Sequence, residues 1–163
     1  IKQTAHHIIN TTGYNIHQLK SQILDLIHDG DKSISLTKIN VISFGFKYGI
    51  PNDADLVVDM RFLSNPYFIP ALKNHDGESD AVKQFVLSNN ETKLFLEKYL
   101  NLLDYLIPLY KRENKAYLTF AIGCTGGRHR SVAIARRIFE HLNKKGLNPE
   151  LIHRDIDRDI KQT

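Results

Sequence analysis

The chain has 163 residues and a formal net charge of +4, and its residues are 42% hydrophobic and 25% charged. This length and balance are typical of one globular domain, and they exclude a low-complexity chain or a small disulfide-stapled scaffold. No apolar run reaches the roughly 18 residues that span a membrane, so we expect no membrane partner. The single cysteine, Cys124, excludes an internal disulfide and indicates a reducing, cytoplasmic location.

Positive charge gathers in the C-terminal third of the chain. Residues 111–163 carry 12 Lys and Arg against 6 Asp and Glu, whereas residues 1–110 carry 10 against 12. Such an imbalance attracts anionic partners to the basic part of the chain. A slightly basic, solvated surface is the alternative that charge alone leaves open.

The first part of the chain is predicted to belong to a neighbouring domain. Residues 7–9 are typical of a short strand, and Asn15 with Gln18 has the pattern of a capping box that begins a helix. We interpret residues 1–30 as the tail of a preceding domain plus a linker helix, and residues 31–163 as the domain that carries the function. Because the first residue is not Met, we expect the chain to be part of a longer protein.

Two buried strands are predicted next, at residues 38–46 and 55–62. The eight residues between them are fewer than a helical crossover usually requires. The two strands are therefore either antiparallel or bridged by a single short helical turn. Residues 63–78 are rich in Asn, Pro, Asp and Gly and are predicted to form an irregular loop.

The rest of the chain alternates between helical and extended patterns. In chain order we predict a helix at 80–87, a longer helix that Asn90 caps and Pro108 kinks or ends, a strand at 117–122, a helix at 129–143 stopped by Gly146, and a strand near 151–153. This order predicts an α/β fold, a three-layer sandwich with a largely parallel sheet. In such folds ligands bind beyond the carboxyl ends of the strands.

A glycine-rich segment at residues 122–131, Ile-Gly-Cys-Thr-Gly-Gly-Arg-His-Arg-Ser, lies between the predicted strand and helix. The backbone N–H groups of Thr125, Gly126, Gly127 and Arg128 can converge on one oxyanion, because glycine tolerates positive φ. The start of the helix adds its own unpaired N–H groups and partial positive charge. The segment is therefore predicted to be a phosphate-binding loop.

Other side chains are expected at the same sheet edge. If the strands share a direction, Lys47, Asp59 and Arg61 emerge beside the loop and line a single pocket with it. Arg130 is the predicted phosphate contact, because a guanidinium suits bidentate recognition of phosphate, while His129 is predicted to begin the helix. For Asp59 and Arg61, an ion pair at a strand end is the alternative to a ligand role.

The spacing of Cys124 and Arg130 also matches the loop of cysteine-dependent phosphatases, in which a thiolate attacks phosphorus. Asp59 would then be the general acid. Against this, Gly123 stands where those phosphatases usually carry His, and a small buried Cys closing a tight turn is the simpler interpretation. No other catalytic residue is assigned, and the histidines show no metal-ligand spacing, so no metal is expected.

Three long segments together carry a family resemblance, namely residues 43–51, residues 53–63 with Asn65-Pro66, and residues 121–132. They resemble the RapZ/YvcJ family of bacterial nucleotide-binding proteins, over nearly the whole chain but only the C-terminal half of the family's protein. The resemblance implies a missing N-terminal P-loop domain that binds and hydrolyses ATP or GTP. No G-x-x-x-x-G-K-[ST] pattern is present here, so this fragment is expected to need no cofactor and not to be the NTPase.

In RapZ the corresponding domain is similar to a sensor that binds the amino-sugar phosphate glucosamine-6-phosphate and small regulatory RNAs. The chain departs from enterobacterial members at Tyr67, where they have His, and at residues 154–159, where charge alternates instead of forming an unbroken basic cluster. It is therefore more similar to the YvcJ branch, and an interrupted cluster should bind RNA weakly.

The leading hypothesis is a ligand-sensing domain for a phosphorylated sugar or nucleotide-sugar. The alternatives are a cysteine-dependent phosphatase and an RNA-binding adaptor, and a homo-oligomer stays open. The predicted ligand- or phosphate-binding residues are Lys47, Asp59, Arg61, Asn65, Cys124, Thr125, Gly126, Gly127, Arg128, His129, Arg130 and Ser131. The predicted RNA-binding residues are Lys144, Lys145, Arg154 and Arg158.

Overall fold

The computed structural model describes residues 37–113 and 115–158, together with Ile9, Thr11, Leu19 and Ile23. The chain forms two compact units, Ile1–Leu36 and Thr37–Thr163. The strand predicted at residues 7–9 and the helix predicted from Asn15 fall almost wholly outside the described residues. Their assignment to a preceding domain stays a prediction.

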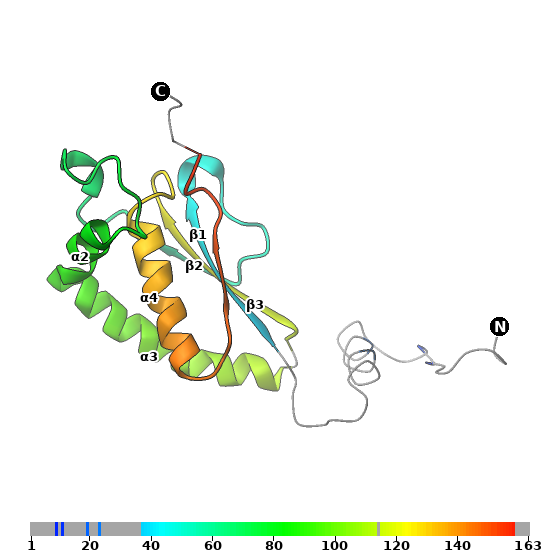
Figure 1. Ribbon diagram of the computed structural model, residues 1–163. Coiled ribbons are helices and arrows are strands. Elements are labelled where there is room, and N and C mark those ends of the chain that lie inside the picture. Colours follow the sequence, from blue (N-terminus) through cyan, green and yellow to red (C-terminus); the bar gives the residue numbers. More distant parts are fainter. Residues whose placement is uncertain are drawn as a thin grey trace. The chain divides into compact units, whose positions relative to one another are not determined.

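The second unit is built on a parallel sheet of four strands (Figure 1). The strands are β1 (Lys38–Gly45), β2 (Leu56–Asp59), β3 (Tyr117–Cys124) and β4 (Glu150–His153), in the order β2-β3-β1-β4. β1 runs parallel to β3 in a register from Lys38 opposite Tyr117 to Gly45 opposite Cys124. The predicted α/β class with a parallel sheet is confirmed. The antiparallel alternative for the first two strands is wrong, because β3 lies between them and pairs with both in parallel.

A single 3₁₀ turn, η1 (Phe46–Tyr48), follows β1 in the short connection to β2. A connection this short leaves no room for a crossover helix on that side of the sheet. The described helices are α2 (Asp80–Ser88), α3 (Asn90–Arg112) and α4 (Arg130–Lys144). The last two pack against the other face, and α2 lies on the same side, where it packs against α3 and α4 (Figure 1). The predicted three-layer sandwich is therefore wrong for the described residues, where one sheet carries one layer of helices.

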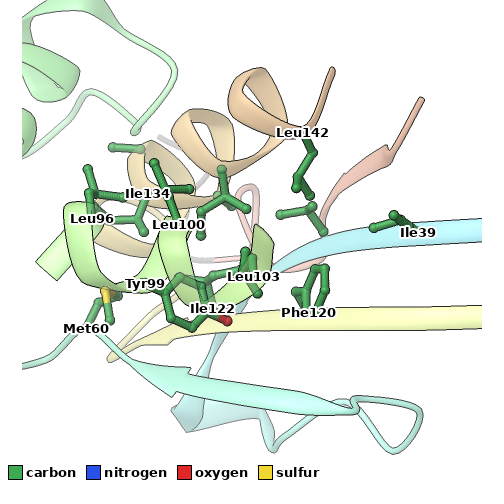
Figure 2. Packing of buried hydrophobic residues seen from close by; sticks show 14 of the residues in the cluster. Ile39, Met60, Leu96, Tyr99, Leu100, Leu103, Phe120, Ile122, Ile134 and Leu142 are labelled. Atoms are coloured by element: carbon green, nitrogen blue, oxygen red, sulfur yellow. The ribbon is translucent and has the colours of Figure 1, made fainter. Parts of the chain in front are cut away.

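The hydrophobic core lies between this face and the helices (Figure 2). Alternate residues of the strands point into it, as the two-residue period of a strand requires, with Phe120 and Ile122 from β3 both fully buried. Leu103 of α3 and Ile134 of α4 are also fully buried against them. Each such side chain contributes about 1.5–3 kcal/mol on burial, so this cluster holds the carboxyl ends of the strands in place.

The boundaries of the helices differ slightly from those predicted. Asn89, not Asn90, caps α3, since its Oδ1 accepts the N–H of Glu91 at 2.8 Å. The helix continues through Pro108 to Arg112, because the buried Leu103 and Ile107 anchor its last turns in the core. His129 is the N-cap residue of α4, as predicted, and Gly146 beyond its end has a φ of 71°. None of the described helices has the length and hydropathy to cross a membrane.

Candidate functional site

The segment between β3 and α4, residues 125–129, lies at the carboxyl edge of the sheet. Its neighbours along that edge are the ends of β1 and β2. The N–H of Lys47 donates to the carbonyl of Thr125 at 3.2 Å, and the N–H of Met60 donates to the carbonyl of Gly123 at 2.7 Å. The structure therefore brings together three segments that are far apart in the sequence.

The glycines of this segment pack directly against the backbone of β1. Gly127 has a φ of +77°, and a Cβ at this position would lie 2.6 Å from the backbone nitrogen of Gly45. A Cβ on Gly45 would in turn lie 2.6 Å from the carbonyl carbon of Gly126. Such distances are too short for any side chain, so glycine is required here both for the positive φ and for the close approach of two backbones.

Arg130, the first residue of α4, joins the segment to the end of β2. Its Nη1 donates to the carbonyls of Arg61 at 3.0 Å and Leu63 at 2.9 Å, and its Nη2 donates to Thr125 Oγ1 at 3.2 Å. The residue is only 4% exposed, and its Nε has no hydrogen-bond partner. Burial lowers the pKa of the guanidinium, because desolvation disfavours its charged form. An anion that reached this Nε would compensate a buried positive charge.

Asp59 and Arg61 form an ion pair at the end of β2. The guanidinium of Arg61 donates to both carboxylate oxygens of Asp59 at 2.7–3.0 Å and lies 4.2 Å from the ring centroid of Phe46. Both side chains are about half exposed. The hydrogen bond from Arg61 lowers the pKa of Asp59. Asp59 thus fixes the direction of an exposed arginine whose Nη1 makes no hydrogen bond within the described residues.

His129 and Arg128 tie the segment to the loop before α2. The Nε2 of His129 donates to the carbonyl of Lys73 at 3.2 Å, and Arg128 donates to the carbonyls of Asn74 at 3.1 Å and Ile156 at 2.7 Å. Burial lowers the pKa of His129 below its ordinary value of 6.5, and the nearby Arg128 and Arg130 act in the same direction. The described hydrogen bonds of these two side chains are therefore all donated to backbone carbonyls.

Cys124 and Ser131 lie beneath the segment. The thiol of Cys124 is buried, and its Sγ is 3.1 Å from Ser131 Oγ, which is also fully buried. Asp59, the acid required by the phosphatase alternative, has a lowered pKa and is therefore poorly suited to donate a proton near neutral pH. The arrangement is that of two small side chains closing a turn.

The remaining predicted ligand residues have other contacts. Asn65 is the N-cap residue of η2 (Pro66–Phe68), and its Oδ1 accepts the N–H of Tyr67 at 3.3 Å. Lys47 is exposed, with its Nζ 5.2 Å from the ring centroid of Tyr48. Asn65 therefore caps the turn after β2, and Lys47 contacts residues 125–129 through its backbone N–H.

The residues predicted to bind RNA are mostly paired with carboxylates. Lys145 Nζ lies 2.6 Å from Asp104 Oδ2, while Arg154 and Arg158 lie 2.7 and 3.1 Å from the oxygens of Asp155. Lys144 is exposed at the end of α4. A polyanion that contacted Arg154 or Arg158 would compete with an internal carboxylate for them.

Asp155 is a site residue that sequence reasoning missed. It is fully buried beside Gly45 and Gly127, whereas the charge alternation of residues 154–159 indicated only an interrupted basic cluster. The signal available was its place two residues after the predicted strand near 151–153, at the carboxyl edge of the sheet. Among the described residues, no group of three or more His, Cys, Asp and Glu is arranged to hold a metal ion.

Comparisons with known proteins agree with this architecture. The family model of the RapZ C-terminal domain matches residues 37–157. The chain is 61% identical over 162 residues to a nucleotide-binding protein of Desulforapulum autotrophicum, covering 99% of this chain and 55% of that protein. It is 51% identical over 158 residues to a nucleotide-binding protein of Trichlorobacter lovleyi, with 97% and 55% coverage.

A third relative, a nucleotide-binding protein of Clostridium beijerinckii, is 48% identical over 160 residues, with 98% and 54% coverage. The chain spans about half the length of the curated relatives that it matches. The family match covers almost all of the described residues, including the sheet and the segment between β3 and α4. The chain therefore belongs to the RapZ family, within which residues 37–157 form the C-terminal domain.

Proposed function

We propose that this domain senses a phosphate-bearing metabolite, a phosphorylated sugar or nucleotide-sugar, at residues 125–130 and Arg61. The observation that carries the proposal is the contact of Arg130 with the backbone of Arg61 and Leu63, because it joins the glycine turn to the end of β2. Glycine N–H groups and a helix N-terminus favour an anion on one side. A guanidinium favours it on the other side.

The two arginines have different tasks in this proposal. Arg61 is about half exposed and held by Asp59 and the Phe46 ring, so its Nη1 is available to phosphate oxygens without a search through rotamers. Arg130 is buried and holds the frame, and it adds positive charge at the start of α4. The phosphate contacts are made by backbone N–H groups and Arg61, within a field to which Arg130 contributes.

The sugar or nucleoside part of the ligand would face the turn after β2. Tyr67 and Phe68 of η2 are well exposed, and the Asn65 cap fixes the turn that presents them. This turn begins two residues after Leu63, whose carbonyl Arg130 holds. The side chains beside the phosphate are thus set by the same contact that orders the loop.

In the full-length protein we expect this domain to report on a separate nucleotide-binding part. The relatives are named nucleotide-binding proteins, and this chain spans about half of their length. We propose that ATP or GTP is bound and hydrolysed outside these residues, in a cytoplasmic regulator of amino-sugar metabolism. Binding of small RNA has weaker support, because Lys145, Arg154 and Arg158 pair with carboxylates.

Isothermal calorimetry with glucosamine-6-phosphate, UDP-N-acetylglucosamine and inorganic phosphate tests the proposal. We expect at least one of them to bind, and Arg61→Ala to weaken that binding roughly tenfold, since a hydrogen bond to a charged group is worth about 1.5–3 kcal/mol. Arg137→Ala, which removes a half-buried arginine farther along α4, is the matched control. Absence of binding to all three compounds, or equal affinities of the two variants, would contradict the proposed site.

A further inference from the structure

Asp155 is a fully buried carboxylate that lies at the end of β4. Its Oδ2 accepts the N–H of Gly45 at 2.8 Å, and Arg154 donates to both of its oxygens at 2.7–3.2 Å. Arg158 forms an ion pair with it, with Nε 3.1 Å from Oδ1. A buried charge is costly unless it is paired and hydrogen-bonded, and here each oxygen has a partner. The position of this carboxylate is therefore tightly determined.

The carboxylate continues the sheet where β4 stops. One step earlier, the N–H of Arg154 donates to the carbonyl of Ser43, as a parallel ladder requires. At the next step the chain turns away, and Asp155 accepts the N–H of Gly45 in place of a backbone carbonyl. Arg154 also donates to the carbonyl of Gly49 at 2.6 Å, so the carboxylate and its partner hold both ends of the turn after β1.

Gly45 in turn supports the two glycines of the segment between β3 and α4. A Cβ added to Gly45 would lie 2.9 Å from the backbone nitrogen of Gly127, and a Cβ added to Gly127 would lie 2.6 Å from that of Gly45. The Cβ added to Gly127 would also lie 2.9 Å from the Cβ of Asp155. Asp155, Gly45 and Gly127 therefore form one layer without free space. A shift of the carboxylate would move Gly45, and with it the turn that carries the N–H groups of Gly126 and Gly127.

We propose that Asp155 is a positioning residue for the anion-binding loop, fixing the direction of its glycine N–H groups through Gly45. This inference rests on the proposed function, in which those N–H groups contact phosphate. Asp155 itself does not touch the anion, and its own charge would repel it. The positioning role and the electrostatic role therefore predict opposite effects of neutralising the carboxylate.

The test is a titration of the isotope-labelled full chain with inorganic phosphate, followed through the amide signals of Gly126 and Gly127. Asp155→Asn is compared with Asp157→Asn, which removes the same charge from an exposed residue two positions along. Asp157→Asn should bind phosphate as tightly as the unaltered chain or slightly more tightly. Asp155→Asn should remain folded and bind roughly tenfold more weakly, as expected when a supporting contact of a binding group is lost.

A carboxylate that only stabilised the fold would lower the melting temperature of Asp155→Asn and leave the affinity of the folded protein unchanged. Asp155→Asn that is folded and binds phosphate as tightly as Asp157→Asn would therefore overturn the inference. A shift of the Gly45 and Gly127 amide signals in the phosphate-free variant, together with weaker binding, would support it. Failure of the unaltered chain to bind any phosphate compound would overturn the proposed function and the positioning role with it.

If Asp155→Asn does not fold, Arg158→Gln decides the question, because it keeps the carboxylate and removes one exposed partner. Its control is Arg137→Gln, which removes an equal charge from α4. Weaker phosphate binding by Arg158→Gln than by Arg137→Gln, with moved Gly45 and Gly127 signals, supports the inference. Equal binding by the two variants overturns it.

Discussion

Two acid–arginine groups flank the same glycine turn, and they differ in exposure. Asp59 and Arg61 at the end of β2 have side chains that are 43% and 51% exposed, whereas Asp155 is 0% exposed beneath its two arginines. Exposed ion pairs add little stability and exchange partners with solvent easily, while a buried carboxylate is held by every contact it makes. The comparison separates a group that can meet a ligand from one that shapes the backbone around it.

Gly127→Ala should cause the largest loss of stability, because Gly127 belongs to the buried group around Asp155. The new Cβ would meet the backbone of Gly45 at 2.6 Å, at a φ of +77° that alanine rarely adopts. Strain of this kind with a steric clash costs about 2–4 kcal/mol, which urea unfolding measures. Gly146→Ala is the matched control, since its φ is also positive but nothing lies within 4 Å of a Cβ there. Equal losses for the two variants would show that packing at Gly127 is unimportant.

Asp155→Ala and Asp59→Ala test the two carboxylates directly against each other. Asp155→Ala leaves the Gly45 N–H without an acceptor and Arg154 with only the carbonyl of Gly49. We therefore expect a loss of about 2–3 kcal/mol, reduced from the cost for a fully buried pair because Arg158 is half exposed. Asp59→Ala should leave the free energy of unfolding nearly unchanged but weaken phosphate binding by freeing Arg61. An equal loss of stability in Asp59→Ala and Asp155→Ala would contradict the different roles assigned to the two carboxylates.

The pH dependence of stability should report His129, the N-cap residue of α4. Because burial lowers its pKa below the ordinary 6.5, the unfolded chain takes up the proton first as the pH falls. Above the unfolded-state pKa, His129 is neutral in both states and its titration does not affect stability. As the pH drops below about 6.5, protonation of the unfolded chain progressively lowers the free energy of unfolding. Urea unfolding of the unaltered chain and of His129→Gln between pH 7.5 and 5 measures it. Identical pH profiles would exclude His129 as the source.

Cys124→Ser should have the smallest effect on function. The thiol is buried against Ser131 and makes no described contact with Arg61, so phosphate affinity should change by less than about twofold, as for most substitutions outside a binding contact. Hydrolysis of p-nitrophenyl phosphate should be absent in both proteins. Turnover by the unaltered chain that Cys124→Ser abolishes would instead favour the phosphatase alternative.

Local patterns predicted which segments meet at the carboxyl edge of the sheet better than they predicted the layers of the fold. Glycine spacing and the strand before it located residues 124–131, and the polar ends of the first two strands indicated Asp59 and Arg61 beside them. The second helical layer was predicted from the alternation of strands and helices. It is absent from the described residues, because the connection at Phe46–Tyr48 is a single turn and cannot cover a face of the sheet.

The roles of individual charged residues were harder to infer. Arg130 was predicted to be the phosphate contact, but its Nη1 is bonded to the carbonyls of Arg61 and Leu63, which belong to a loop without regular periodicity. Its Nη2 is bonded to Thr125. Asp155 lies in a run of alternating charges that indicated only an interrupted basic cluster. Sequence spacing shows which residue types are near one another along the chain, but it does not show which carbonyls a long side chain will find.

By itself the sequence determined the parallel α/β character, the glycine turn at the start of a helix, the family, and the gathering of arginines near the turn. These follow from hydrophobic periodicity, from the backbone freedom of glycine and from long shared segments, all of which are local or linear properties. Only the tertiary structure decided which arginine is exposed and which is buried, and that Asp155 replaces a strand carbonyl beneath the loop. The reason is physical, since burial and hydrogen-bond partners depend on the packing of segments up to 110 residues apart.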